Sequence, residues 1–178
     1  VLLRKHGFLE TNRATTTPPT FKARAQIISE GGTAFVYLTD PKLSADERKK
    51  VVALLGGITG VVEVIEPARF AELGLPNPEK NRQMADFILV AAPGYAFSNR
   101  NDGDDVVTPV TLESGNPGHH GRLASNPKMN AIFVVTGRRI KKGARLQIVD
   151  NRDVAPTIAH LLGESLPADG KVIREILE

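Results

Sequence analysis

The chain has 178 residues, of which 41% are hydrophobic and 24% charged, so it can bury the core of one ordinary domain, with or without a small insertion. Lys and Arg number 23 against 20 Asp and Glu; this near balance, scattered along the chain, excludes a broadly basic surface. The absence of cysteine excludes disulfides, thiolate metal sites and cysteine nucleophiles. No apolar run approaches the roughly 20 residues of a membrane span.

The first residues are typical of the end of a helix. Residues 1–9 carry basic side chains before Gly7, which is expected to end the helix. The composition of residues 1–7 is not that of a signal peptide, and from the start at Val1 rather than Met we expect a piece of a longer protein. Residues 11–20 are rich in Thr and Pro and are expected to form a surface connection.

The next part of the chain alternates between strand-like and helix-like segments. Ser44 is a good N-cap for a helix through Leu55, and Gly31-Gly32 is expected to be a turn between two strands. The predicted strands are 25–28, 34–38, 60–65 and 85–92, and a second, short helix is predicted at 67–74. The sequence therefore predicts a small α/β subdomain over residues 23–92, resembling a cap.

The last part is expected to return to strands and one helix. Apolar runs predict strands at 130–137 and 146–149, and Asp153 is expected to N-cap a helix through Leu162. The basic cluster 138–142 between the two strands is interpreted as a solvated turn, with contact to phosphate or nucleic acid as the alternative.

A glycine-rich segment with two histidines, 114–121, is the candidate functional feature. Half of the chain's four histidines are His119 and His120, and neutral imidazole is the commonest protein ligand of zinc. Neighbouring residues point in different directions, so at most one of the two is expected to face a given site. The alternative is an exposed loop with two solvated histidines. His120 alone cannot form a catalytic metal site, which needs about three protein ligands, so its co-ligands would have to come from outside this chain.

An ordered set of short motifs resembles the C-terminal part of the type I phosphodiesterase/nucleotide pyrophosphatase family, in the alkaline phosphatase superfamily. The motifs lie at Val1 to Leu9, at Ala91-Ala92-Pro93-Gly94-Tyr95-Ala96-Phe97, at His120-Gly121, at Pro127 to Gly137, at Gly143, at Asp153 to Gly163 and at Leu166-Pro167 with Asp169-Gly170. The match spans nearly the whole chain and is loosest between Thr11 and Met84. Each motif is modestly specific, and their order and spacing carry the resemblance.

The resemblance implies a metal-dependent phosphodiesterase or nucleotide pyrophosphatase with two divalent ions, most often zinc, and a Thr or Ser nucleophile. His120 matches a family metal ligand; His119, Asn116 and Tyr95 are weaker candidates for substrate binding or for a place behind the ligands. The nucleophile and the other ligands would lie upstream, so this chain alone is expected to be inactive. Expected partners are a nucleotide or other phosphate-ester substrate and the preceding part of the protein, without nucleic acid. Many members of this family are exported from the cell, so the resemblance is compatible with an exported protein.

The resemblance also implies a fold: the C-terminal portion of an alkaline-phosphatase-like α/β sandwich with a small α/β cap-like insertion. On this reading residues 1–22 are a helix end and linker of the catalytic core, 23–92 the insertion, and 93–178 the C-terminal part of the core with the histidines. Two alternatives stay open: a non-catalytic α/β binding module, and a phosphonate or phosphomonoester hydrolase of the same superfamily.

Overall fold

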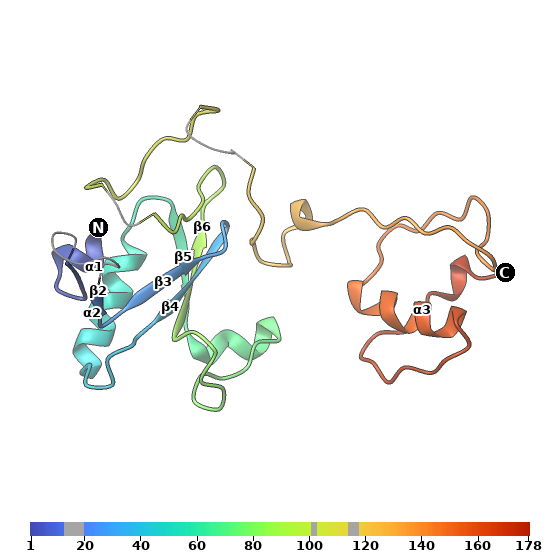
Figure 1. Cartoon of the computed structure of the whole chain (residues 1–178), viewed down its shortest axis with the longest axis horizontal. Helices are drawn as coiled ribbons and strands as arrows, with labels where there is room; N and C mark the ends of the chain where they lie inside the picture. The colour runs from blue at the N-terminus through green and yellow to red at the C-terminus, as the bar shows by residue number, and fades with distance from the viewer. Residues whose placement is uncertain (13–19, 101–102, 114–117) are drawn as a thin grey trace. The chain divides into compact units, whose positions relative to one another are not determined.

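The computed structural model describes residues 1–12, 20–100, 103–113 and 118–178, and divides into two compact units, Val1–Asn130 and Ala131–Glu178 (Figure 1). Its mixed α/β character confirms the broad fold class, with two small antiparallel sheets and few helices. The alkaline-phosphatase-like sandwich and the three-part division at 22/23 and 92/93 stay predictions.

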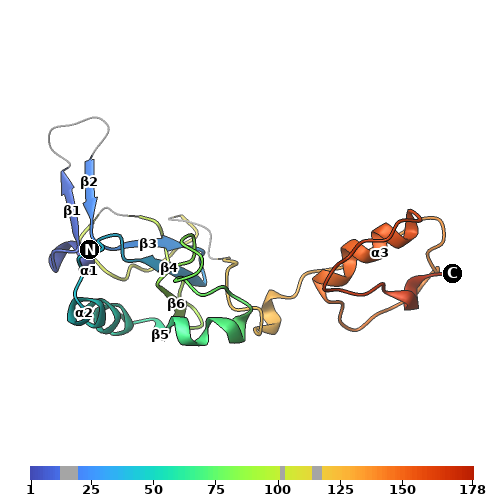
Figure 2. The ribbon, with the colours of Figure 1, turned by 90° about the horizontal axis from the view of Figure 1, so that it is seen from below.

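The first unit contains both sheets. β1 (Leu9–Asn12) pairs antiparallel with β2 (Thr20–Ala23) beside the short helix α1 (Leu2–Lys5) (Figure 2). The elements that follow are β3 (Gln26–Ser29), β4 (Thr33–Tyr37), α2 (Ala45–Gly56), β5 (Val61–Ile65), the 3-10 helix η1 (Pro67–Leu73), β6 (Phe87–Ala91) and the 3-10 helix η2 (Pro127–Met129). The strand and helix order predicted for residues 23–92 is thus confirmed.

The larger sheet has the strand order β3-β4-β6-β5, and every neighbouring pair is antiparallel. β4 and β5 both run antiparallel to β6, so they run parallel to each other, with α2 as the crossover between them. β6, the last strand in sequence, therefore lies inside the sheet, and its C-terminal end at Ala91 lies beside the start of β4 at Thr33.

Both faces of this sheet are covered. Phe87 and Leu89 of β6 are buried in one cluster with Val51 and Leu55 of α2, while Ile88 is buried in a second cluster with Phe70 of η1. Because successive side chains of a strand point to opposite faces, the two clusters lie on opposite sides of the sheet (Figure 1). The two clusters are mainly aliphatic, and Phe8, Phe70 and Phe87 are buried within them.

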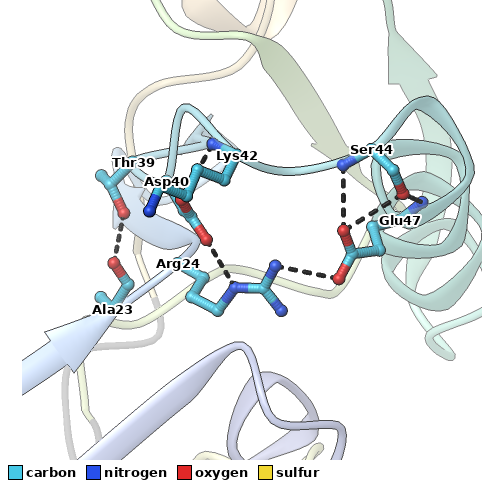
Figure 3. Close-up of polar contacts among 7 residues, drawn as sticks. All are labelled: Ala23, Arg24, Thr39, Asp40, Lys42, Ser44 and Glu47. Carbon is cyan, nitrogen blue, oxygen red and sulfur yellow. Dashed lines mark hydrogen bonds and ion pairs between the residues drawn. The ribbon is translucent and has the colours of Figure 1, made fainter.

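The N-terminus of α2 is fixed by a capping box and an arginine (Figure 3). The Ser44 hydroxyl accepts from the Glu47 amide at 3.2 Å and the Glu47 carboxylate accepts from the Ser44 amide at 2.9 Å, confirming Ser44 as the N-cap. Arg24 donates from Nη2 to Glu47 at 2.9 Å and from Nε to Asp40 at 2.7 Å. The hydrogen bond from Arg24 lowers the pKa of Asp40; the Ser44 amide, followed by Arg24, lowers the pKa of Glu47.

The second unit is built around α3 (Val154–Leu161), preceded by the 3-10 helix η3 (Asn151–Asp153) and followed by η4 (Arg174–Ile176). Asp153 stands at the N-cap position but makes no capping bond; its carboxylate accepts instead from the Lys171 amide at 2.8 Å. The buried Thr157 hydroxyl donates to the Asp153 carbonyl at 2.6 Å and accepts from the Ile173 amide at 2.9 Å. These bonds tie α3 to residues 171–173.

The strands predicted at 130–137 and 146–149 are not present in the structure. No strand is assigned over either segment, and Ile132, Val134 and Ile148 are 92%, 82% and 82% exposed. A strand exists only when a neighbouring strand completes its hydrogen bonds. Within the described part of this unit the pairing is limited to a bridge between Ile140 and Leu177, so the apolar pattern meets no partner.

Candidate functional site

His119, His120 and Gly121 lie against the turn between β3 and β4, and this turn is the predicted one at Gly31-Gly32. The Glu30 amide donates to the Thr33 carbonyl at 2.9 Å and closes the turn. The Ser29 hydroxyl accepts from the Gly31 amide at 3.1 Å, and Gly31 has a φ of +76°, in the left-handed region that favours glycine. The turn is thus ordered by its own hydrogen bonds.

Two hydrogen bonds join the backbone of residues 120 and 121 to this turn. The Gly32 amide donates to the His120 carbonyl at 2.8 Å, and the buried Thr33 hydroxyl donates to the Gly121 carbonyl at 2.7 Å. Gly121 has a φ of +78° and lies so close to the Glu30 carbonyl oxygen that a Cβ would collide with it. The close neighbour of Gly121 is therefore protein backbone.

Arg122 connects the same segment to the end of β6. Its Nη1 donates to the Ala91 carbonyl at 2.9 Å, and its Nη2 donates to the carbonyls of Ala92 and Tyr95 at 3.3 and 2.9 Å. The Gly31 carbonyl in turn accepts from the Phe97 amide at 2.7 Å. Residues 91–97 and 120–122, far apart in the sequence, therefore meet at the β3–β4 turn.

Both histidine side chains are exposed on this fixed backbone. A Cβ on Gly31 would lie 3.5 Å from Nδ1 of His119, so the His119 ring lies against the turn. The structure thus supplies a clamped backbone with accessible imidazoles. Among the described residues, no group of three or more His, Asp, Glu or Cys side chains could hold a metal ion. A metal at His120 would need ligands beyond those described.

Two of the weaker candidates are Tyr95 and Asn116. The Tyr95 ring packs on Gly60, and it is the Tyr95 carbonyl that contacts Arg122. Asn116 lies outside the described residues. Arg122 and Thr33 connect the segment to the sheet, and sequence reasoning missed both. An arginine after His-His-Gly and a threonine after Gly-Gly carry no local signal of a contact across the fold.

The basic cluster 138–142 has structural contacts of its own. Arg139 has a φ of +70° and donates from Nη1 to the Leu161 carbonyl at 3.2 Å, at the end of α3. Lys141 and Lys142 line an open cavity of about 480 Å³ that Glu175 and Glu178 also line. Arg145 also lines this cavity, so its lining includes three basic and two acidic side chains. Within the described residues no helix is long and apolar enough to cross a membrane.

Comparison of the chain with protein-family models, with curated proteins and with solved structures finds no match.

Proposed function

We propose that this chain is the C-terminal part of a metal-dependent phosphodiesterase or nucleotide pyrophosphatase, to which it contributes one metal ligand, His120. The supporting observation is the exposed imidazole of His120, on a backbone fixed by the Gly32 amide and the Thr33–Gly121 bond. The second support is the ordered set of family motifs. A ligand on a fixed backbone loses little conformational freedom when it binds an ion.

The imidazole of His120 fits a divalent transition metal such as zinc as a donor, but one imidazole is a fraction of a two-metal site. When bound, two ions would stabilise the attacking oxygen and the charge on the phosphoryl oxygens. This chain's own share is to present one imidazole and to keep it in place. We assign the Thr or Ser nucleophile and the remaining ligands to a preceding part of the protein.

The test is the hydrolysis of bis(4-nitrophenyl) phosphate by the intact protein with added zinc. We expect His120→Ala to lower kcat/KM by about 100-fold or more, because a ligand is lost from the metal site. The matched control is His6→Ala, an exposed histidine of the same unit that stands at the C-cap of α1. Full activity in His120→Ala would contradict the ligand assignment, as would an intact protein without a Thr or Ser nucleophile and further Asp and His ligands.

The same assay separates the alternatives. A phosphonate hydrolase would prefer 4-nitrophenyl phenylphosphonate and a phosphomonoesterase would prefer 4-nitrophenyl phosphate, and both would still depend on His120. A non-catalytic α/β binding module would turn over none of the three substrates with zinc present.

A further inference from the structure

The backbone that carries the histidines is fixed from both sides of Gly121. On one side the His120 carbonyl accepts a hydrogen bond from the Gly32 amide. At Gly121 itself the carbonyl accepts a hydrogen bond from the Thr33 hydroxyl. On the other side Arg122 reaches the carbonyls of Ala91, Ala92 and Tyr95. We call these three groups of contacts the histidine clamp.

We propose that Arg122 is a positioning residue that sets the place of His120 relative to the end of β6. Its consequence for metal binding rests on the function proposed above. Arg122 is two residues from His120, and the intervening Gly121 lies so close to the Glu30 carbonyl that a side chain there would collide with it. We expect a movement of residue 122 away from β6 to shift residue 120 relative to Gly32, because only Gly121 separates the two.

The geometry of the contact suits an arginine side chain best. A guanidinium offers five N–H donors in a rigid planar fork, and its hydrogen bonds are charge-assisted. Three carbonyl oxygens from residues 91, 92 and 95 converge on it, at 2.9 to 3.3 Å. A lysine ammonium is a point charge on a flexible stem and can satisfy only part of this set. Lysine at position 122 should therefore retain a weakened clamp, and methionine should lose it.

The clamp itself is tested by hydrogen exchange at the Gly32 amide, measured by NMR. In the whole chain we expect Arg122→Met to speed this exchange about tenfold or more, and Arg122→Lys to fall between Arg122→Met and the unaltered chain. The matched control is Arg69→Met, which removes an arginine that pairs with Glu63 and Glu72 of the same unit. Unchanged exchange at Gly32 in Arg122→Met would overturn the proposal.

The positioning role is tested in the intact protein by competition for zinc with a chelator and by the visible spectrum of the cobalt form. We expect Arg122→Met to weaken zinc binding by about 10- to 100-fold and to alter the cobalt spectrum, with partial rescue in Arg122→Lys. The positioning role would be overturned if Arg122→Met kept the zinc affinity and the cobalt spectrum of the unaltered protein while His120→Ala bound zinc more weakly. If His120→Ala also binds zinc normally, the proposed function is wrong, and Arg122 is judged on the Gly32 exchange alone.

Discussion

The hydroxyl of Thr33 donates a 2.7 Å hydrogen bond to the carbonyl oxygen of Gly121, a residue 88 positions further along the chain. Thr33 is buried at the start of β4, in register with Val90 of β6. The bond therefore joins the histidine segment to the inside of the sheet rather than to a surface loop. Together with the bond from the Gly32 amide to the His120 carbonyl, it ties the backbone of residues 120 and 121 to β4 and its turn.

Removing that hydroxyl should loosen the segment. We expect Thr33→Val, which keeps the shape of the side chain, to lower the free energy of unfolding of the first unit by about 1–2 kcal/mol, because the Gly121 carbonyl loses its partner. Urea denaturation monitored by circular dichroism measures the change. Thr33→Ser keeps the hydroxyl and serves as the control; a loss in Thr33→Ser as large as in Thr33→Val would assign the effect to packing instead.

Gly121→Ala should cost more unfolding free energy than the left-handed φ of Gly121 alone predicts. Gly121 combines a φ of +78° with contact against the Glu30 carbonyl, whereas Gly7 has a φ of +75° and nothing within 4 Å of a Cβ. We expect Gly7→Ala to cost about 1 kcal/mol of unfolding free energy and Gly121→Ala about 2–4 kcal/mol, or to release the segment from the turn. Equal costs in the two variants would show that the close approach at Gly121 carries no free energy.

The network of Arg24 with Asp40 and Glu47 should make stability depend on acid pH. Both carboxyl pKa values are lowered in the folded chain, so their contribution is complete above their ordinary pKa values near 4 and is lost as the pH falls through the lowered ones. We expect the unaltered chain to lose more unfolding free energy between pH 5 and pH 3 than Arg24→Met does. Urea denaturation at several pH values tests this, with Arg69→Met as the control arginine. Parallel curves for Arg24→Met and the unaltered chain would refute it.

The hydroxyl of Thr157 should hold residues 171–173 of the second unit in place. Its hydroxyl makes two buried hydrogen bonds, to the Asp153 carbonyl and from the Ile173 amide. We expect Thr157→Val to raise the hydrogen exchange rate of the Ile173 amide by about tenfold or more, since that amide loses its acceptor. The exposed Thr136→Val is the control. The same exchange rate in Thr157→Val and Thr136→Val would mean that this hydroxyl does not fix residues 171–173.

Several elements could be predicted because their cause is local. The order Ser44, Asp46 and Glu47 before an apolar run specifies a helix start, and the structure has the complete capping box there. The runs around Phe35 and Leu89 specify strands, and Gly31-Gly32 specifies the turn between β3 and β4. Each of these signals operates within a few residues of the place where it acts.

The strand prediction at 130–137 was wrong because a strand also depends on a partner elsewhere in the chain. Its apolar run is as long as that of β6, but β6 lies between β4 and β5, whereas Ile132 and Val134 are exposed. The β propensity of a segment indicates how well its side chains fit a pleated sheet, but the segment forms a strand only when a partner strand is available. The helix predicted after Asp153 is confirmed with Asp153 at its N-cap position, but the capping bond is absent, since the carboxylate accepts from the distant Lys171 amide.

By itself the sequence determined the local frame: a mixed α/β chain, the capped helix α2, the strands around it and a glycine-flanked pair of histidines. Only the tertiary structure decided that Gly121 lies under the Glu30 carbonyl, that Thr33 and Arg122 fix the backbone on both sides of it, and that both imidazoles stay exposed. The physical reason is distance along the chain. Capping, turns and periodicity act between near neighbours, whereas a hydrogen bond across 88 residues exists only after the sheet has formed.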